Sequence, residues 1–313
     1  MSDSILSEIN KIGERVSEEL ELDECIADEV SDWQRLNGLE DHPDADVVTS
    51  QLSAFNYLLK TTLYRIYQKS EPELETIEDA DEVQKKLRRA HEVTDDNALE
   101  RFILDEIANQ IEPEVFKNLL GYRSTLSEDE EAYETIGQIY ESIVDQEARR
   151  NLGQFRTPGY MAEIMAQWAI QNADARVLDP GTGAGVLTAH IYQIKKTTES
   201  GNTAHVDDIY GIDVSQLAIV MTATSLKIAN GGNSPNLLCG DFLDTIVKEP
   251  NTSIDKVNPT VMPKMDAIVS NPPYSRGKLL KEEKDRINKK AERYTGKDVS
   301  KRAPLYHYFY IHA

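Results

Sequence analysis

The sequence predicts an α/β protein in which an all-helical N-terminal region precedes a parallel sheet. Over the first 150 residues, apolar residues recur at spacings of three and four. After residue 150, short apolar runs alternate with helical segments, and each run leads within a few residues to an Asp or Asn and then a turn or helix. Strands that alternate with helices form parallel sheets, whose binding sites lie at the carboxyl ends of the strands.

The N-terminal region contains one strongly apolar stretch. Residues 47–67 place their Leu, Phe and Ile side chains three and four positions apart, which predicts a helix buried on one face. Residues 71–82 are rich in acid and predict a linker or helix start. Residues 99–111 repeat the helical spacing, and Pro113 is expected to end or restart that helix.

Charge is unevenly distributed along the chain. Residues 1–150 carry 38 acidic and 15 basic side chains, whereas residues 151–313 carry 17 acidic and 19 basic. Within residues 276–302, 11 basic residues outnumber 5 acidic ones, an excess suited to neutralising phosphates, although a solvated helix or loop has the same composition. The net charge of −21 therefore does not exclude DNA binding, and whether it reflects a high-salt habitat stays open.

Composition points away from metal sites, disulfides and membrane spans. The two cysteines lie far apart, and Cys239, which follows an apolar run, is expected to be a small buried residue. No apolar run has signal-peptide character or reaches the roughly 20 residues of a membrane helix. We expect a soluble, cytoplasmic protein without a bound metal. The spacing that metal ligands usually have is not found among the cysteines and histidines considered, which are Cys25, Cys239, His190, His205, His307 and His312.

The first predicted strand runs into a Gly-rich turn. Residues 177–178 are followed by Asp179-Pro180-Gly181-Thr182-Gly183-Ala184-Gly185. Glycine permits positive φ and close approach of a ligand to the backbone. No Gly-Lys-Ser/Thr follows, which distinguishes this turn from the phosphate loop of nucleoside triphosphatases. The turn favours a nucleotide-like ligand, while an ordinary tight strand-to-helix turn would use the same residues.

The second and third predicted strands lead to acidic residues. Asp213 ends the run Tyr210-Gly211-Ile212, where a carboxylate can accept hydrogen bonds from ribose hydroxyls, a device shared with nicotinamide-dinucleotide enzymes. Asp241 could accept a hydrogen bond from an adenine amine, and Phe242 could pack on the adenine ring. A loop-capping Asp beside a buried Phe explains the same pair.

The fourth predicted strand, residues 266–270, leads directly into Asn271-Pro272-Pro273-Tyr274. The N6 amine of adenine is a poor nucleophile until hydrogen-bond acceptors draw on its hydrogens. The side-chain carbonyl of Asn271 and the backbone carbonyl of Pro272 could be those acceptors, and two prolines restrict the loop that presents them. Tyr274 would stack on a base rotated out of the duplex. A proline turn with a buried tyrosine is the structural alternative.

From about Glu134 to Tyr274 the sequence resembles the amino-methylating DNA adenine methyltransferases of restriction–modification and related phage-defence systems. The resemblance includes the upstream element Gly153-Gln154-Phe155-Arg156-Thr157-Pro158, which other Asn-Pro-Pro-Tyr enzymes generally lack. It implies the Rossmann-like fold of S-adenosylmethionine-dependent methyltransferases, with a helical N-terminal domain (1–133) and a catalytic domain (134–313). It also implies methyl transfer from S-adenosyl-L-methionine to the N6 amine of adenine in DNA. The implied cofactor-binding residues are Phe155, Thr157, Pro158, Asp179, Gly181, Gly183, Asp213, Asp241 and Phe242, and the implied catalytic residues are Asn271, Pro272, Pro273 and Tyr274.

The sequence departs from that family after the Asn-Pro-Pro-Tyr motif. The family's sheet has seven strands, whereas about four are found before Ala313, so we expect a C-terminally incomplete sheet from a truncated product, a split enzyme or a fragment. The implied partners are DNA, a specificity subunit or restriction endonuclease, or a chain that supplies the missing strands. Two alternatives stay open: methylation of RNA adenine or protein glutamine, and a non-catalytic or partner-completed cofactor-binding subunit. The recognised DNA site is not readable from this sequence.

Overall fold

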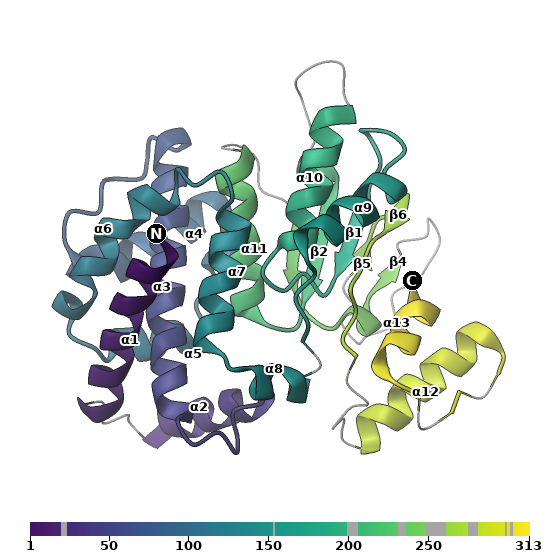
Figure 1. Cartoon of the computed structure of the whole chain (residues 1–313), viewed down its shortest axis with the longest axis horizontal. Coiled ribbons are helices and arrows are strands. Elements are labelled where there is room, and N and C mark those ends of the chain that lie inside the picture. Colours follow the sequence, from purple (N-terminus) through teal and green to yellow (C-terminus); the bar gives the residue numbers. More distant parts are fainter. Residues whose placement is uncertain are drawn as a thin grey trace.

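The computed structural model describes residues 1–19, 24–152, 154–198, 206–230, 236–247, 261–274, 281–297, 299–300 and 303–313. Figure 1 shows a bundle of helices beside a small sheet that is itself flanked by helices. Gly153, His205 and parts of the basic stretch 276–302 lie outside the described residues. Among those described, no helix combines the length and the apolar character that a membrane span requires.

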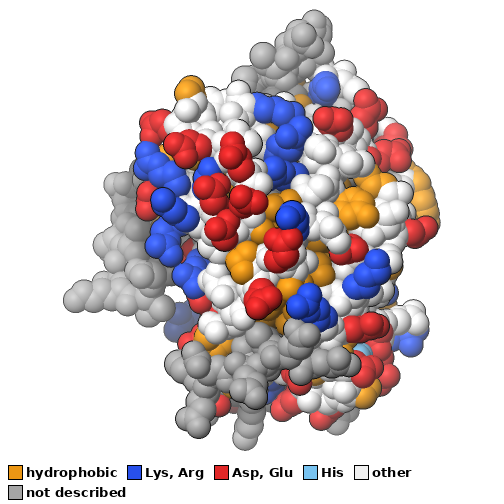
Figure 2. All heavy atoms as spheres, turned by 90° about the vertical axis from the view of Figure 1, so that its left-hand side faces the viewer, with side chains coloured by type: hydrophobic (Ala, Val, Ile, Leu, Met, Phe, Trp, Pro, Cys, Tyr) orange, Lys and Arg blue, Asp and Glu red, His pale blue; other side chains and the backbone are white. Residues whose placement is uncertain are grey.

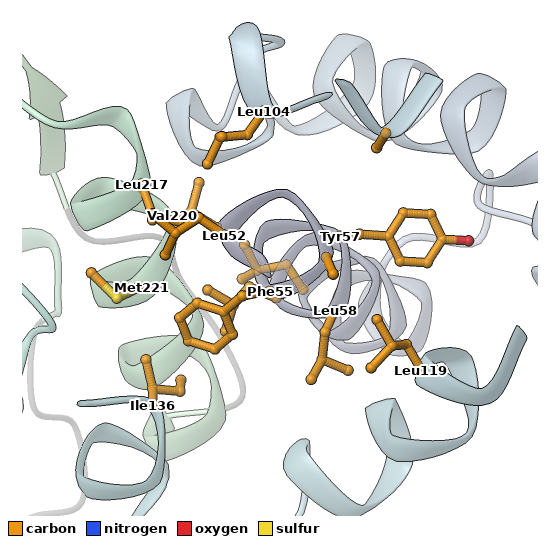
Figure 3. Close-up of a cluster of buried hydrophobic side chains, with 14 of the residues drawn as sticks. Leu52, Phe55, Tyr57, Leu58, Leu104, Leu119, Ile136, Leu217, Val220 and Met221 are labelled. Atoms are coloured by element: carbon orange, nitrogen blue, oxygen red, sulfur yellow. The ribbon is translucent and has the colours of Figure 1, made fainter. Parts of the chain in front are cut away.

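The N-terminal region is helical, as its apolar spacing predicts. Its central helix, α3 (Ala45–Ser70), is buried on nearly all sides rather than on one face, because other helices surround it. Figure 3 shows Phe55 and Leu58 of α3 among the buried side chains. The surrounding helices are α1 (Ser2–Glu19), α2 (Glu24–Leu36), α4 (Val83–Thr94), α5 (Ile103–Asn109), α6 (Lys117–Leu126) and α7 (Ala132–Ile143).

The helix predicted over residues 99–111 is shorter than its apolar spacing indicates. Leu99 lies in a separate 3-10 turn, and α5 begins only at Ile103. The break is at Phe102, whose backbone is extended and whose N–H donates to the Asp105 carboxylate at 3.0 Å. Pro113 starts a further 3-10 turn, Pro113–Phe116.

One ion pair is buried inside this helical region. Lys60 and Asp105 are 1% and 3% exposed, and Lys60 Nζ lies 2.7 Å from Asp105 Oδ2. Lys60 also donates to the Glu100 carbonyl at 2.6 Å, and Asn56 donates to Asp105 Oδ1 at 2.9 Å. These hydrogen bonds compensate two charges that would otherwise be costly to bury.

The outward face of the helical region is shown in Figure 2. Acidic and basic side chains are interspersed there, with apolar side chains between them. The acid excess of residues 1–150 therefore does not form a uniform acidic patch on this face.

Four parallel strands form the sheet, in the order β3-β2-β1-β6. They are β1 (Val177–Pro180), β2 (Ile209–Asp213), β3 (Asn236–Cys239) and β6 (Ala267–Ile268), and all four coincide with predicted apolar runs. Val177 pairs with Ile209 on one side and with Ala267 on the other, so β1 lies inside the sheet. A separate parallel pair, β4 (Ile246–Val247) and β5 (Val261–Met262), was not predicted.

Helix α11 and a hydrogen bond from Asn97 connect the sheet to the N-terminal region. Leu217, Val220 and Met221 of α11 share a core with Phe55 of α3, as Figure 3 shows. On the β3 edge, Asn97 of the helical region donates to the Leu237 carbonyl at 2.9 Å. The division of the chain at residues 133/134 stays a prediction. The remaining helices are α8 (Gln146–Leu152), α9 (Gly159–Ala169), α10 (Val186–Thr198), α11 (Gln216–Asn230), α12 (Lys281–Thr295) and α13 (Leu305–His312).

Candidate functional site

A cleft of about 2080 Å³ opens at the carboxyl ends of the strands. This exceeds the roughly 300–1,000 Å³ of a small-molecule pocket, because the cleft continues between the sheet and residues of the helical region. The residues predicted for the site come from distant parts of the sequence, and the structure brings most of them to this cleft. All of them line it except Pro158, Pro272 and Tyr274.

The Gly-rich turn between β1 and α10 forms part of the cleft wall. Gly181, Gly183 and Gly185 have φ values of +89°, +54° and +82°. A Cβ added at Gly181 or Gly183 would meet nothing within 4 Å, so their backbone borders open space. Gly185 differs, because its Cβ would lie 2.9 Å from the Cα of Thr222 on α11. Two of these glycines therefore border the cleft, and the third permits close helix packing.

Asp213, at the end of β2, holds two turns together. Its Oδ2 accepts a hydrogen bond from the Gly183 N–H at 3.0 Å, and its Oδ1 accepts one from the Ser215 N–H at 2.9 Å. Burial raises the pKa of this carboxyl, and these backbone hydrogen bonds oppose the rise. Each carboxylate oxygen has a second acceptor position, so Asp213 can still accept hydrogen bonds from a ligand.

Asp179, in β1, is a buried carboxyl with an unused oxygen. It is 1% exposed, and its Oδ2 accepts a hydrogen bond from Thr188 Oγ1 at 3.0 Å. Its Oδ1 has no partner among the described residues, and burial raises the pKa of Asp179 to about 7. A buried acceptor without a partner calls for an explanation, and a donor on a ligand in the adjoining cleft would provide one.

Asp241 and Phe242 have the local structure of the capping alternative. Asp241 Oδ1 accepts a hydrogen bond from the Leu243 N–H at 2.9 Å and caps a short 3-10 helix, η5 (Phe242–Asp244). Phe242 is 4% exposed, with its ring centroid 5.1 Å from that of Phe309. Both residues still line the cleft, so capping does not remove them from it.

Asn271 is oriented by the upstream element. Its Nδ2 donates to the Phe155 carbonyl and to Thr157 Oγ1, both at 3.0 Å. A carbonyl can only accept, so the atom that faces Phe155 must be the amide nitrogen. Within the described chain, the Asn271 amide oxygen has no hydrogen-bond partner. A free acceptor is thereby presented beside the Gly-rich turn, to which Ser270 is joined by a 2.8 Å hydrogen bond to the Pro180 carbonyl.

Three aromatic rings lie together at this loop, and two of them are exposed. Tyr274 and Phe155 are 51% and 52% exposed, and their ring centroids lie 5.8 Å apart in an edge-to-face arrangement. The ring of Tyr306, at the start of α13, is partly buried, and its centroid lies 5.8 Å from that of Tyr274 in a tilted arrangement. Tyr274 is therefore not the buried side chain of an ordinary proline turn, and part of its ring is available for stacking.

The sequence did not identify the residues that anchor the upstream element. Arg156 forms ion pairs with Glu134 and with Glu141 of α7, the second at 3.3 Å, and Glu141 also accepts from Arg149 at 2.8 Å. The available signal was the seven-residue spacing of Glu134 and Glu141, which places both on one helix face. The spacing of the two glutamates does not predict which arginine pairs with them, because Arg156 lies on a different segment of the chain.

The expectation that Cys239 is buried is wrong. Its side chain is exposed, and its Sγ lies 3.7 Å from the Val214 carbonyl. The reason is its place at the carboxyl end of β3, an edge strand, where the chain borders the cleft.

Comparison with known proteins identifies the family. The model of the N-6 DNA Methylase family matches residues 131–312. The chain is 29% identical over 182 residues to the type II methyltransferase M.BanIII of Aneurinibacillus aneurinilyticus, covering 55% of this chain and 29% of that protein. It is 28% identical over 144 residues to the type I restriction enzyme EcoEI methylase subunit of Escherichia coli, covering 44% of this chain and 27% of that subunit. The chain therefore spans less than a third of the length of either relative.

A solved structure supports the fold. The cryoEM structure of a DrdV–DNA complex matches 99% of this chain and 33% of that chain, with a TM-score of 0.50 and 14% sequence identity. At that identity the likeness concerns the fold alone. Because the family match covers more than half of its residues, the chain belongs to the N-6 DNA methylase family.

Proposed function

We propose that the cleft binds S-adenosyl-L-methionine and that the chain transfers its methyl group to the N6 amine of adenine in DNA. The observation that carries this proposal is the orientation of Asn271. Its amide nitrogen is engaged by Phe155 and Thr157, which leaves the amide oxygen as an acceptor for an amine. In an enzyme, an acceptor that is fixed in advance needs no reorganisation during the reaction.

The residues of the cleft fit this cofactor chemically. The cofactor carries an ammonium group, two ribose hydroxyls and an adenine amine, all of which donate hydrogen bonds. The cleft offers the carboxylates of Asp179, Asp213 and Asp241, including the Asp179 oxygen that has no partner in the described part of the chain. Backbone at Gly181 and Gly183 permits close approach. The cofactor-binding residues of this proposal are Phe155, Thr157, Pro158, Asp179, Gly181, Gly183, Asp213, Asp241 and Phe242.

The protein's own contribution would be to bind and orient the acceptor. S-adenosyl-L-methionine supplies a methyl group activated by a positively charged sulfur. The Asn271 amide oxygen and the Pro272 carbonyl would accept the two N6 hydrogens, which makes the nitrogen lone pair more nucleophilic. Pro272 and Pro273 restrict the loop, and Tyr274 would stack on the adenine after its rotation out of the duplex. Positioning and these acceptors would supply most of the catalysis, without a covalent enzyme intermediate.

The biological role is also a proposal, since the chain spans less than a third of the length of the two relatives described above. Those relatives are named as a type II methyltransferase and as a type I restriction enzyme methylase subunit. By analogy, this chain would act in the modification part of a restriction–modification or phage-defence system. Its partners would then be DNA and either a specificity subunit or a restriction endonuclease.

Identification of the methylated product tests the proposed acceptor. The purified chain would be incubated with S-adenosyl-L-methionine carrying a labelled methyl group and, separately, with unmethylated plasmid DNA, total RNA and protein substrates. Digestion of the DNA to nucleosides should place the label in N6-methyldeoxyadenosine. Label in RNA or in protein glutamine, with none in DNA, would contradict the proposal.

A partner-completed subunit is the second candidate. The observation that favours it is β6, which has two residues in the sheet and pairs only with β1 among the described residues. This candidate predicts that the chain binds the cofactor but transfers no methyl group until a second polypeptide is added.

A further inference from the structure

Two helices that follow the Asn-Pro-Pro-Tyr loop form one wall of the cleft. Ile287 of α12 is 5% exposed and belongs to the same buried cluster as Phe242. Phe309 of α13 packs on Phe242, and both Ile287 and Phe309 line the cleft. The helices are joined by a hydrogen bond of 2.5 Å from the Tyr308 hydroxyl to Asn288 Oδ1. Figure 1 shows them side by side next to the sheet.

Arg286 of α12 bridges Asp244 of the short helix η5 and Asp241, which caps that helix. Its Nη1 is bound to Asp244 Oδ1, and its Nη2 lies 3.5 Å from Asp241 Oδ2. Lys290, one turn further along α12, lies 3.7 Å from Asp244 Oδ1. Two basic side chains of the stretch 276–302, whose composition suits phosphates or a solvated helix, are thus directed toward acidic groups beside the cleft.

These contacts leave the Asp241 carboxylate with a defined orientation. Oδ1 accepts from the Leu243 N–H, and Oδ2 faces the Arg286 guanidinium. Asp241 and Asp244 are three residues apart in the sequence, so without Arg286 their negative charges would repel each other. Burial raises the pKa of Asp241 in addition. A planar guanidinium can contact two carboxylates at once, which the single ammonium of a lysine does less well.

We infer that Arg286 is a positioning residue of the cofactor site, which holds Asp241 so that its carboxylate accepts a hydrogen bond from the adenine amine. This inference rests on the proposed binding of S-adenosyl-L-methionine. It gives Arg286 a role in distinguishing an adenine ring from a purine that lacks the amine. Because the Arg286 side chain is 49% exposed, salt should weaken its effect.

The test compares two ligands that differ at one position of the purine. Calorimetric titrations of the full chain would use S-adenosylhomocysteine and S-inosylhomocysteine, in which a carbonyl oxygen replaces the amine. The wild type should prefer S-adenosylhomocysteine. Arg286→Ala should lower affinity for that ligand about two- to fivefold, in line with half-exposed ion pairs, while affinity for S-inosylhomocysteine stays unchanged. Raising the salt concentration should reduce the difference between wild type and variant.

Two further variants control for folding and for charge. Arg286→Lys keeps the charge and should restore part of the preference for the amine. Arg293→Ala removes an exposed arginine of the same helix, which has no ion pair among the described residues, and should bind like the wild type. Circular dichroism would verify that each variant is folded.

The outcomes separate this inference from the proposed function. If Arg286→Ala weakens both ligands equally, Arg286 supports the wall in general and does not position Asp241. An unchanged ligand preference in Arg286→Ala would also overturn the inference while leaving the cofactor site intact. If the wild type binds neither ligand, the proposed cofactor site fails and the inference fails with it.

Discussion

Replacement of Gly185 by alanine should destabilise the chain through both its backbone and its packing. Gly185 has φ +82°, and an added Cβ would lie 2.9 Å from Thr222 Cα and 3.1 Å from Thr222 Oγ1. The nearest atom belongs to the backbone of α11, so a simple side-chain rotation cannot relieve the contact. The opposite face of α11 packs into the core around α3, through Leu217 and Val220, which prevents the helix from moving away.

The backbone strain and the overpacking each lower the free energy of unfolding. A left-handed backbone costs a residue with a Cβ roughly 1–2 kcal/mol, and overpacking in a close-packed region costs about 1–3 kcal/mol more. We therefore expect Gly185→Ala to lower the free energy of unfolding by about 2–5 kcal/mol.

Gly183→Ala is the matched control. Gly183 also has a positive φ, +54°, but its added Cβ would meet nothing within 4 Å. This variant should lose only the backbone contribution of about 1–2 kcal/mol. The assay is urea unfolding followed by circular dichroism. Equal losses in the two variants, or no loss in Gly185→Ala, would refute the close-packing argument.

Three further predictions concern the site and the core. Asn271→Ala should abolish methyl transfer, because it removes the acceptor for the adenine amine, and should leave cofactor affinity nearly intact, because the two hydrogen bonds that it removes go to the upstream element. Retained transfer would contradict the assigned role. Lys60→Met should lower the free energy of unfolding in urea by about 3–5 kcal/mol, because it leaves Asp105 buried without its cation. The double variant with Asp105→Leu should recover much of this loss, and the absence of any recovery would show that the buried charge is not the cause. Asp179 has a raised pKa of about 7, so its contribution to stability is complete below about pH 4 and is lost as the pH rises through about 7. Relative to the wild type, Asp179→Asn should therefore gain stability across that window, and a constant difference would show that the carboxyl does not titrate as described.

The four strands of the main sheet could be predicted because local patterns specify them. Each of the four strands is a short apolar run that ends near an acid, an asparagine or a glycine turn, and these signals need no knowledge of distant residues. Parallel topology then placed the site at the carboxyl ends of the strands, where the cleft lies. The two-residue strands β4 and β5 have no such pattern, because their pairing depends on the surrounding fold.

Features that depend on contacts between distant residues were not predictable. The ion pairs of Arg156 join segments 15 and 22 residues apart, and those of Arg286 join segments 42 and 45 residues apart. Cys239 was misjudged because an apolar neighbourhood in sequence does not reveal that a strand lies at the sheet edge. Helix α5 was overestimated because the Asp105 side chain bonds the Phe102 backbone and favours a later start.

Calorimetric titration of the chain with S-adenosyl-L-methionine tests directly whether the cleft binds this cofactor. Asp213→Ala removes the carboxylate that binds the backbone N–H groups of Gly183 and Ser215 and that would accept the ribose hydroxyls. Asp174→Ala, at an exposed aspartate before β1, is the matched control. We predict one cofactor bound per chain, with binding lost in Asp213→Ala and kept in Asp174→Ala. Absence of binding by the wild type, or equal binding by Asp213→Ala, would contradict the assignment of this cleft as the cofactor site.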